Sequence, residues 1–227
     1  MKKQLILACA LLMSVTAYSQ EFTLEYQPGY GAYNMSSMKV HLKQSLQNSP
    51  LKGVKTTDNF SGYLTHSLRM GYLINKHHFG IIFSHMNTAG QNHLADYSGE
   101  YLYRMRVYGN KLGVFYQIAL SEPGILTPFF ELSTGCVFNK ARIKASLSVE
   151  GTGASNDEAK LKGTNLFVQP ALGVVYRFSS FASLSASVGY EWDPLTGMSI
   201  EGNKANINAD WSGLRINAGI TTYFKTK

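Results

Sequence analysis

Six charged residues recur along the chain, each on the polar side of a segment in which apolar and polar residues alternate. The rest of that polar side is rich in Gly, Ser and Thr. Ionised groups that face a narrow interior need partners, because an unpaired buried charge is costly. Three acids and three bases therefore predict a network of ion pairs, with a selectivity ring in a conducting pore as the alternative. The predicted lumen ion pairs are formed by Glu25, Arg69, Glu131, Arg177, Glu191 and Arg215.

A second group of charges is entirely basic. With a turn centred near Gly124, residues 100–119 and 128–149 form a hairpin in which Arg104 faces Lys144 and Arg106 faces Arg142. Like charges directly opposite each other destabilise a sheet. They indicate either a solvated face balanced by nearby carboxylates or an anion site for lipopolysaccharide phosphates or an acidic glycan. The residues of this anion-binding rim are Arg104, Arg106, Lys140, Arg142 and Lys144.

Catalytic chemistry has little support in the sequence. His66-Ser67 and Ser84-His85 are adjacent pairs, and adjacent strand residues point to opposite faces, so neither pair can act alone as a dyad. A pair from two strands, such as His66 with Ser84, keeps a lipid A-modifying enzyme as an alternative. The six histidines show no metal-ligand spacing. We predict no catalytic residue, no metal and no cofactor.

The first residues predict export. Lys2 and Lys3 precede an apolar run over 5–15 and a small-residue cleavage site at 17–19, which is typical of a secretory signal peptide. We expect residues 1–19 to be the signal and 20–227 to be one domain. Removal of two lysines lowers the net charge from +7 to +5 (7 − 2). Cys136 is then the only cysteine, so an internal disulfide is excluded.

Period-two alternation recurs through the remaining chain and predicts strands with two different faces. Eight segments show it: 22–34, 61–74, 78–87, 100–119, 128–149, 165–178, 182–192 and 214–227. Short connections alternate with long ones, the long ones at roughly 35–60, 88–99, 150–164 and 193–211. Short turns at one end and long loops at the other are typical of an outer-membrane β-barrel. A soluble periplasmic sandwich or barrel is the alternative.

A membrane barrel must close, because an unpaired strand edge in lipid is costly. The regular final segment, LRINAGITTYFKTK, is therefore expected to pair with the first segment. Within 100–119 and 128–149 the apolar residues switch from one side of the strand to the other. In the first segment, for example, Leu112 and Val114 have even numbers, whereas Met105 and Val107 have odd numbers. This change predicts paired β-bulges at the barrel rim. Beyond them the two strands would project from the membrane as a basic ribbon.

The first long loop carries helical spacing. Met35, Met38, Leu42 and Leu46 recur near every third or fourth residue, with Ser36 or Ser37 in place to cap the helix. Such an amphipathic helix could dock a partner, lie on the membrane interface, or fold over the barrel mouth as a lid.

The sequence resembles the small eight-stranded outer-membrane β-barrel proteins, in particular the outer membrane protein beta-barrel domain group common in Bacteroidetes. The resemblance rests on a signal ending in Ser-Gln and on the stretches PGYGAYNM, GVKTTDNFSGY, DYSGEY and GITTYF. It implies an eight-stranded antiparallel transmembrane barrel with short periplasmic turns and four long extracellular loops. It also implies recognition of the last strand by the barrel assembly machinery. Phe224 departs from the usual terminal aromatic because three residues follow it.

We therefore expect a protein of the bacterial outer membrane, in a Gram-negative cell envelope, with a structural or surface-binding role through its loops and basic rim. A narrow porin-like channel is the first alternative. Expected partners are outer-membrane lipid, lipopolysaccharide and an extracellular ligand at the loops. The compartment excludes nucleic acid, and we expect a monomer.

Overall fold

The computed structural model describes residues 20–47, 49, 51–97, 99–149, 153–195, 198–200, 203–205 and 207–225. The predicted signal peptide, residues 1–19, lies outside these ranges. In the described part of the chain, no helix is both long and apolar enough to cross a membrane.

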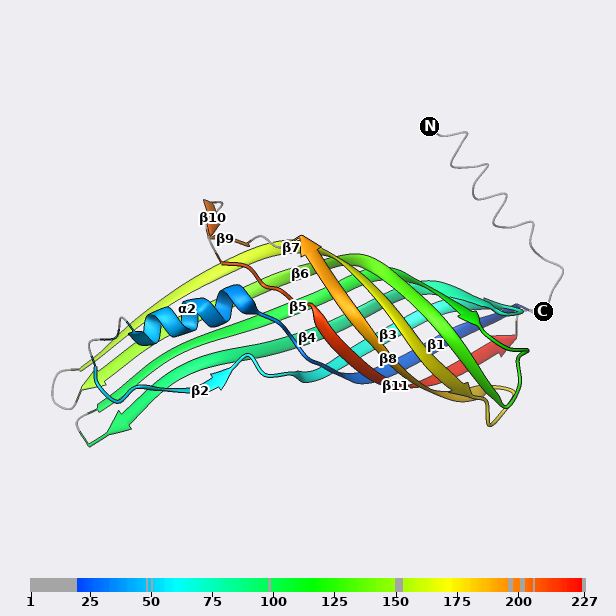
Figure 1. Ribbon diagram of the computed structural model, residues 1–227, viewed down its shortest axis with the longest axis horizontal. Helices are drawn as coiled ribbons and strands as arrows, with labels where there is room; N and C mark the ends of the chain where they lie inside the picture. The colour runs from blue at the N-terminus through cyan, green and yellow to red at the C-terminus, as the bar shows by residue number, and fades with distance from the viewer. Residues whose placement is uncertain are drawn as a thin grey trace.

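Eight antiparallel strands close into a barrel (Figure 1). Each pairs with the next in the chain, and the last pairs with the first, so that Tyr26 lies opposite Ile220. The pairing expected of the final segment is therefore confirmed. The strands are β1 (Gln20–Gly31), β3 (Tyr63–Ile74), β4 (His77–Asp96), β5 (Gly99–Ala119), β6 (Leu126–Val149), β7 (Gly153–Tyr176), β8 (Ala182–Leu195) and β11 (Gly213–Lys225).

The two faces of the barrel wall have opposite polarity. Side chains such as Ile81, Val114 and Leu172 point outward and are about half exposed. The residues whose side chains point into the barrel are buried and polar, as Ser133 and Gln169 are. An apolar outside around a polar inside is the reverse of a soluble barrel and fits a wall in contact with lipid.

Both ends of the described chain lie at one end of the barrel, the terminal end, together with the short connections β3–β4, β5–β6 and β7–β8 (Figure 1). The four long connections between strands lie at the opposite end, as expected, but two of them consist largely of strand rather than loop. Residues 88–96 belong to β4, and residues 153–164 belong to β7. The expectation of loops over 88–99 and 150–164 is therefore wrong for residues 88–96 and 153–164, because these residues continue the sheet.

Strands β4 to β7 run on beyond the barrel as a curved sheet, the extension. Within the barrel, inward Lys111 alternates with outward Leu112. Farther along β5, inward Met105 and Val107 are fully buried, whereas Arg106 between them is exposed. The apolar side has thus moved from the outside of the wall to the inside.

This change occurs without a bulge. The pairing of β5 with β6 is continuous from Gly99–Val149 to Ala119–Phe129, so the prediction of paired bulges is wrong. The strands keep their pleat while their surroundings change. Within the barrel, lipid lies outside and a polar lumen inside. Along the extension, water lies outside and an apolar core inside.

That core, the cap core, is covered by helix α2 (Ser36–Gln47), which lies along the inner face of the extension (Figure 1). Met38 and Leu42 of the helix are buried, so its apolar face is turned toward the sheet. Of the three roles considered for this helix, the structure supports the lid. The buried residues of the core are Tyr33, Met35, Met38, Leu42, Phe60, Met86, Met105, Val107, Val137, Ala141, Leu161, Phe167, Met198, Ala209 and Trp211.

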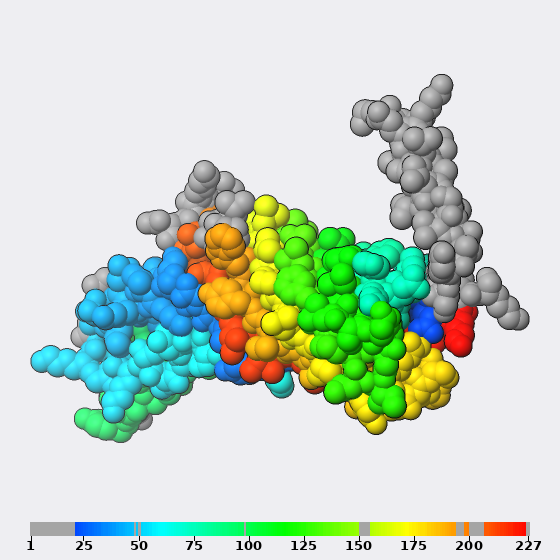
Figure 2. All heavy atoms as spheres, turned by 45° about the vertical axis from the view of Figure 1, so that its right-hand side comes forward, coloured from blue at the N-terminus to red at the C-terminus, as the bar shows by residue number. Residues whose placement is uncertain are grey.

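Polar contacts fix the helix at its place. The Asn92 side-chain amide of β4 donates to the Leu42 carbonyl oxygen at 2.8 Å. His41 and the Tyr103 hydroxyl of β5 are 3.0 Å apart, and burial raises the pKa of Tyr103 to about 12. Short strand β2 (Lys55–Asn59) pairs with β4, and β9 (Met198–Ile200) pairs with β7 and with β10 (Asn203–Ala205). Figure 2 shows α2 and β2 gathered at this end, the cap end.

Candidate functional site

The lumen holds a first ion cluster around Arg69 of β3. Its guanidinium lies 3.1 Å from a Glu25 carboxylate oxygen and also pairs with Glu131. The Phe115 ring lies beneath it, 3.9 Å from the guanidinium carbon, an arrangement that favours a cation. Ser185 donates to the other oxygen of Glu25 at 2.8 Å. Arg69, Glu25 and Glu131 are almost completely buried, so each charge depends on the others.

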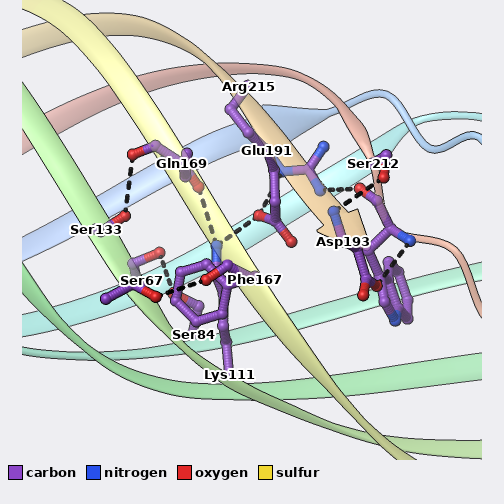
Figure 3. A network of polar contacts seen from close by, with 12 residues as sticks. Ser67, Ser84, Lys111, Ser133, Phe167, Gln169, Glu191, Asp193, Ser212 and Arg215 are labelled. Carbon is purple, nitrogen blue, oxygen red and sulfur yellow. Dashed lines mark hydrogen bonds and ion pairs between the residues drawn. The ribbon is translucent and has the colours of Figure 1, made fainter. Parts of the chain in front are cut away.

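A second cluster lies nearer the cap end, around Glu191 of β8 (Figure 3). One of its oxygens accepts from Lys111 and, at 3.2 Å, from Arg215. Lys111 also donates to Gln169 at 2.9 Å and stands over the Phe167 ring. The first cluster carries two acids and one base, and the second two bases and one acid. Their formal charges, −1 and +1, cancel.

Arg177 forms a separate pair at the terminal end. It donates to both carboxylate oxygens of Glu21, at 2.9 and 2.8 Å, and lies over the Tyr223 ring. The structure therefore pairs all six predicted lumen charges, but as three groups rather than one network. Sequence reasoning missed Lys111 and Glu21. Lys111 carried a signal, because alternation with outward Leu112 places it on the inner face.

Two aromatic rings narrow the lumen further, because each extends from its own strand over a glycine of a neighbouring strand. An added Cβ at Gly71 or Gly113 would lie about 3 Å from the end of the Phe115 or Phe167 ring, respectively. Gly219 leaves the space that Glu25 fills, since a Cβ there would lie 2.4 Å from Glu25 Oε1. Small residues on the inner face therefore make room for the charged and aromatic ones.

The mouth of the lumen meets the cap core at Trp211, which is fully buried. Its indole nitrogen donates to Asn139 at 2.6 Å, and its carbonyl oxygen accepts from Arg215. Asp193 accepts from the Asn165 side-chain amide and from the Trp211 backbone N–H. One connected set of contacts thus joins the second ion cluster to the underside of the cap.

The outer face of the extension carries the predicted basic rim. Arg104 lies directly opposite Lys144, Arg106 opposite Arg142, and Tyr108 opposite Lys140, so the predicted register is confirmed. On β7 the same rows continue with Lys160 opposite Arg142 and Lys162 opposite Lys140. These two lysines were missed, although alternation around buried Leu161 places both on the outer face.

Few acids balance this face. Glu158 lies 3.2 Å from Arg142, 3.8 Å from Lys144 and 3.5 Å from Lys160, in pairs that are largely exposed to solvent. Such pairs contribute little. In the described part of the chain, Arg104 and Arg106 have no carboxylate within salt-bridge distance. Arg104 instead donates from its Nε to the Gln91 side chain.

Two hollows flank Arg104, Arg106 and Tyr108. The β5–β6 hollow has a volume of about 170 Å³ and is also lined by Leu102, Arg142 and Lys144. The β4–β5 hollow has a volume of about 380 Å³, and its further lining includes Asp58, Tyr63, Asn87 and Gln91. The outer face is therefore shaped as well as charged.

The histidine and serine pairs do not form a dyad. Ser84 points into the lumen and bonds Ser67 at 2.8 Å. His66 points outward, is exposed, and bonds the Tyr26 hydroxyl. The His66–Ser84 pairing considered from sequence is thus wrong, because the two side chains lie on opposite sides of the wall. Among the described residues, no three His, Cys, Asp or Glu side chains could hold a metal ion.

No family model and no curated protein matches this sequence. Among solved structures, it is similar to the outer membrane protein OprG from Pseudomonas aeruginosa, with a TM-score of 0.50 and 12% identity over 92% of this chain and 98% of that one. Neisserial surface protein A matches with a TM-score of 0.45 and 14% identity over 89% and 97%. At such identities the likeness shows the fold alone. The chain has the fold of the small outer-membrane β-barrels, and its lipid-facing wall belongs in a bacterial outer membrane.

Proposed function

We propose that this chain is a structural or surface-binding protein of the outer membrane, that its working surface is the basic outer face of the extension, and that its lumen is closed by ion pairs. Short turns of such barrels face the periplasm, so the terminal end faces the periplasm and the cap end faces outward. The observation that carries the proposal is the pairing of Arg106 with Arg142 across β5 and β6.

Facing cations weaken a sheet unless an anion lies between them. Here the arrangement is repeated, since Arg104 faces Lys144 in the next row and Lys140 faces Lys162. A single carboxylate, that of Glu158, is shared among Arg142, Lys144 and Lys160. An anionic partner would relieve the repulsion, and lipopolysaccharide phosphates or an acidic glycan are the anions available outside the membrane.

Charge reversal tests this role. The triple variant Arg106→Glu, Arg142→Glu, Lys144→Glu should lose most of the lipopolysaccharide that co-purifies with the folded barrel. The matched control is Lys39→Glu, Lys43→Glu, Lys52→Glu, because it reverses three lysines of the same cap end, in α2 and the segment after it, none of which belongs to a strand of the extension. Equal retention by both triple variants would contradict the proposal.

The closed lumen is supported by the two ion clusters and by the cap core above them. A narrow porin-like channel is the second candidate. One observation favours it: a hollow of about 70 Å³ enters from the terminal end and reaches Glu25 and His78.

Conductance in a planar bilayer separates the two candidates. We expect the folded wild type to insert without steady openings. Removing the second cluster alone with Lys111→Ala, Glu191→Ala and Arg215→Ala should also give no steady openings, because the first cluster and the cap core remain in the path of an ion. Steady openings of the wild type would instead support a pore lined by Glu25, Arg69, Glu131 and Arg215.

Three further assignments belong to this proposal. We place the chain in the outer membrane protein beta-barrel domain group of Bacteroidetes, on the sequence stretches quoted above. It acts as a monomer without enzymatic activity. The barrel assembly machinery recognises its last strand through Phe224, which packs against Phe22 with ring centroids 6.0 Å apart.

A further inference from the structure

We propose that the two hollows of the outer face form one site for a phosphorylated saccharide, with the phosphate in the β5–β6 hollow and the sugar in the β4–β5 hollow. This inference rests on the proposed surface-binding function and deepens it. The two hollows share a wall made of Arg104, Arg106 and Tyr108. A single ligand can therefore contact both hollows across that wall.

The β5–β6 hollow has the chemistry of a phosphate site. Four cationic side chains line about 170 Å³: Arg104, Arg106, Arg142 and Lys144. A phosphate monoester carries a charge of about −1.5 to −2 at neutral pH, whereas a carboxylate or a sulfate ester carries −1. Arginine binds phosphate oxygens through two parallel N–H groups. The number of cations and the volume thus favour a phosphate.

The β4–β5 hollow has the chemistry of a sugar site. Its volume, about 380 Å³, falls within the range of roughly 300–1,000 Å³ that is common for small-molecule sites. Asp58, Asn87 and Gln91 supply acceptors and donors for hydroxyl groups, while Tyr63 and Tyr108 supply aromatic surface. Gln91 also accepts a hydrogen bond from Arg104 Nε. A residue that lines the sugar hollow therefore orients a cation that lines the phosphate hollow.

The position of the site argues against a phosphate of the lipid headgroup layer. The last outward aromatic residues below the site are Phe138 of β6 and Tyr108 of β5, which lies opposite Lys140. Lys144 follows the level of Tyr108 by four residues. At about 3.3 Å per residue and a tilt of about 40°, the row of Arg104 and Lys144 stands roughly 10 Å above that level. The interfacial layer is only about 5–8 Å thick on each side. The ligand is therefore a sugar phosphate held away from the bilayer, either in the saccharide part of lipopolysaccharide or free in solution.

Titration calorimetry on the folded barrel in detergent tests the site. Glucose 6-phosphate should bind at least tenfold more tightly than inorganic phosphate, and glucose alone should bind least. Arg106→Gln should weaken both phosphate probes at least tenfold. Asp58→Ala with Asn87→Ala should weaken glucose 6-phosphate alone. Lys43→Gln, on the exposed side of α2 and in the lining of neither hollow, is the control and should change neither affinity more than twofold.

The outcomes separate the two levels of the proposal. Phosphate binding that depends on Arg106 but shows no preference for glucose 6-phosphate would overturn the saccharide site and leave the basic face as an anion surface. Binding unaffected by Arg106→Gln would overturn both. If the purified barrel retains rough lipopolysaccharide but not lipid A, which lacks the core saccharide, then the ligand is the saccharide part of lipopolysaccharide. Binding of glucose 6-phosphate without retention of either would identify a free sugar phosphate.

Discussion

Lys111 and Met105 lie on the same inward face of β5, yet one is a buried cation and the other a buried apolar side chain. Lys111 belongs to the ion pairs of the lumen, and Met105 belongs to the cap core beneath α2. One uninterrupted strand thus contributes to two interiors of opposite chemistry. Substitutions in the two interiors should therefore have separable effects.

The first prediction concerns the lumen. Glu191→Gln leaves Lys111 and Arg215 buried without their shared carboxylate. Breaking a buried ion pair from one side costs about 3–5 kcal/mol. The free energy of unfolding in urea, measured on the barrel in lipid vesicles, should fall by that order.

The control for this variant is Glu122→Gln. Glu122 of the β5–β6 turn pairs with Lys76 of the β3–β4 turn, where both side chains are exposed, and exposed pairs contribute little. The unfolding midpoint should not change. A fall of equal size in both variants would mean that loss of any carboxylate, and not of the buried pair, destabilises the barrel.

The second prediction concerns the cap. Leu42→Ala removes a buried side chain from the face of α2 that contacts the sheet, and such truncations cost about 2–5 kcal/mol. The helix should become sensitive to limited proteolysis while the barrel keeps its heat-modifiable migration. Val40→Ala, on the exposed face of the helix, should leave the digestion pattern unchanged. Loss of barrel migration in Leu42→Ala would show that the two interiors are not separable.

The third prediction concerns assembly. Phe224 and Phe178 are outward aromatic residues of the terminal end, each about half exposed. If the assembly machinery reads Phe224, then Phe224→Ala should lower the folded fraction in cells but not the yield of refolding into detergent. Phe178→Ala should lower neither. Equal defects in cells and in detergent would indicate a loss of barrel stability rather than of recognition.

The fourth prediction concerns a glycine of the lumen. A Cβ at Gly219 would meet Glu25 Oε1 at 2.4 Å and Ser185 Oγ at 2.5 Å. Since Glu25 is held by Arg69, Gly219→Ala should destabilise the barrel by about 1–3 kcal/mol in the same urea assay. Gly124→Ala in a short turn is the control, because a Cβ there meets its nearest neighbour at 3.9 Å. Tolerance of Gly219→Ala would show that the first cluster can shift.

Much of the barrel could be predicted from alternation alone. Period-two patterns identify each strand and its outward face, and the short turn around residue 124 sets the β5–β6 register that places Arg106 opposite Arg142. Lumen charges could be recognised because a polar residue between two outward apolar residues must point inward. Lys111 was missed although it obeys that rule.

The sequence by itself therefore determined the barrel part of each strand and its two faces, the hairpin register and the helix of the first connection, because all of these depend on neighbours that are close in the chain. It did not determine that β4 and β7 continue over 88–96 and 153–164. Tertiary structure alone decided which lumen charges meet, since the partners of Arg69 come from β1 and β6. It also decided that the parity change in β5 and β6 marks a change of surroundings and not a bulge. An apolar side faces lipid in one half of a strand and a packed helix in the other, and alternation cannot distinguish the two, because both remove apolar surface from water.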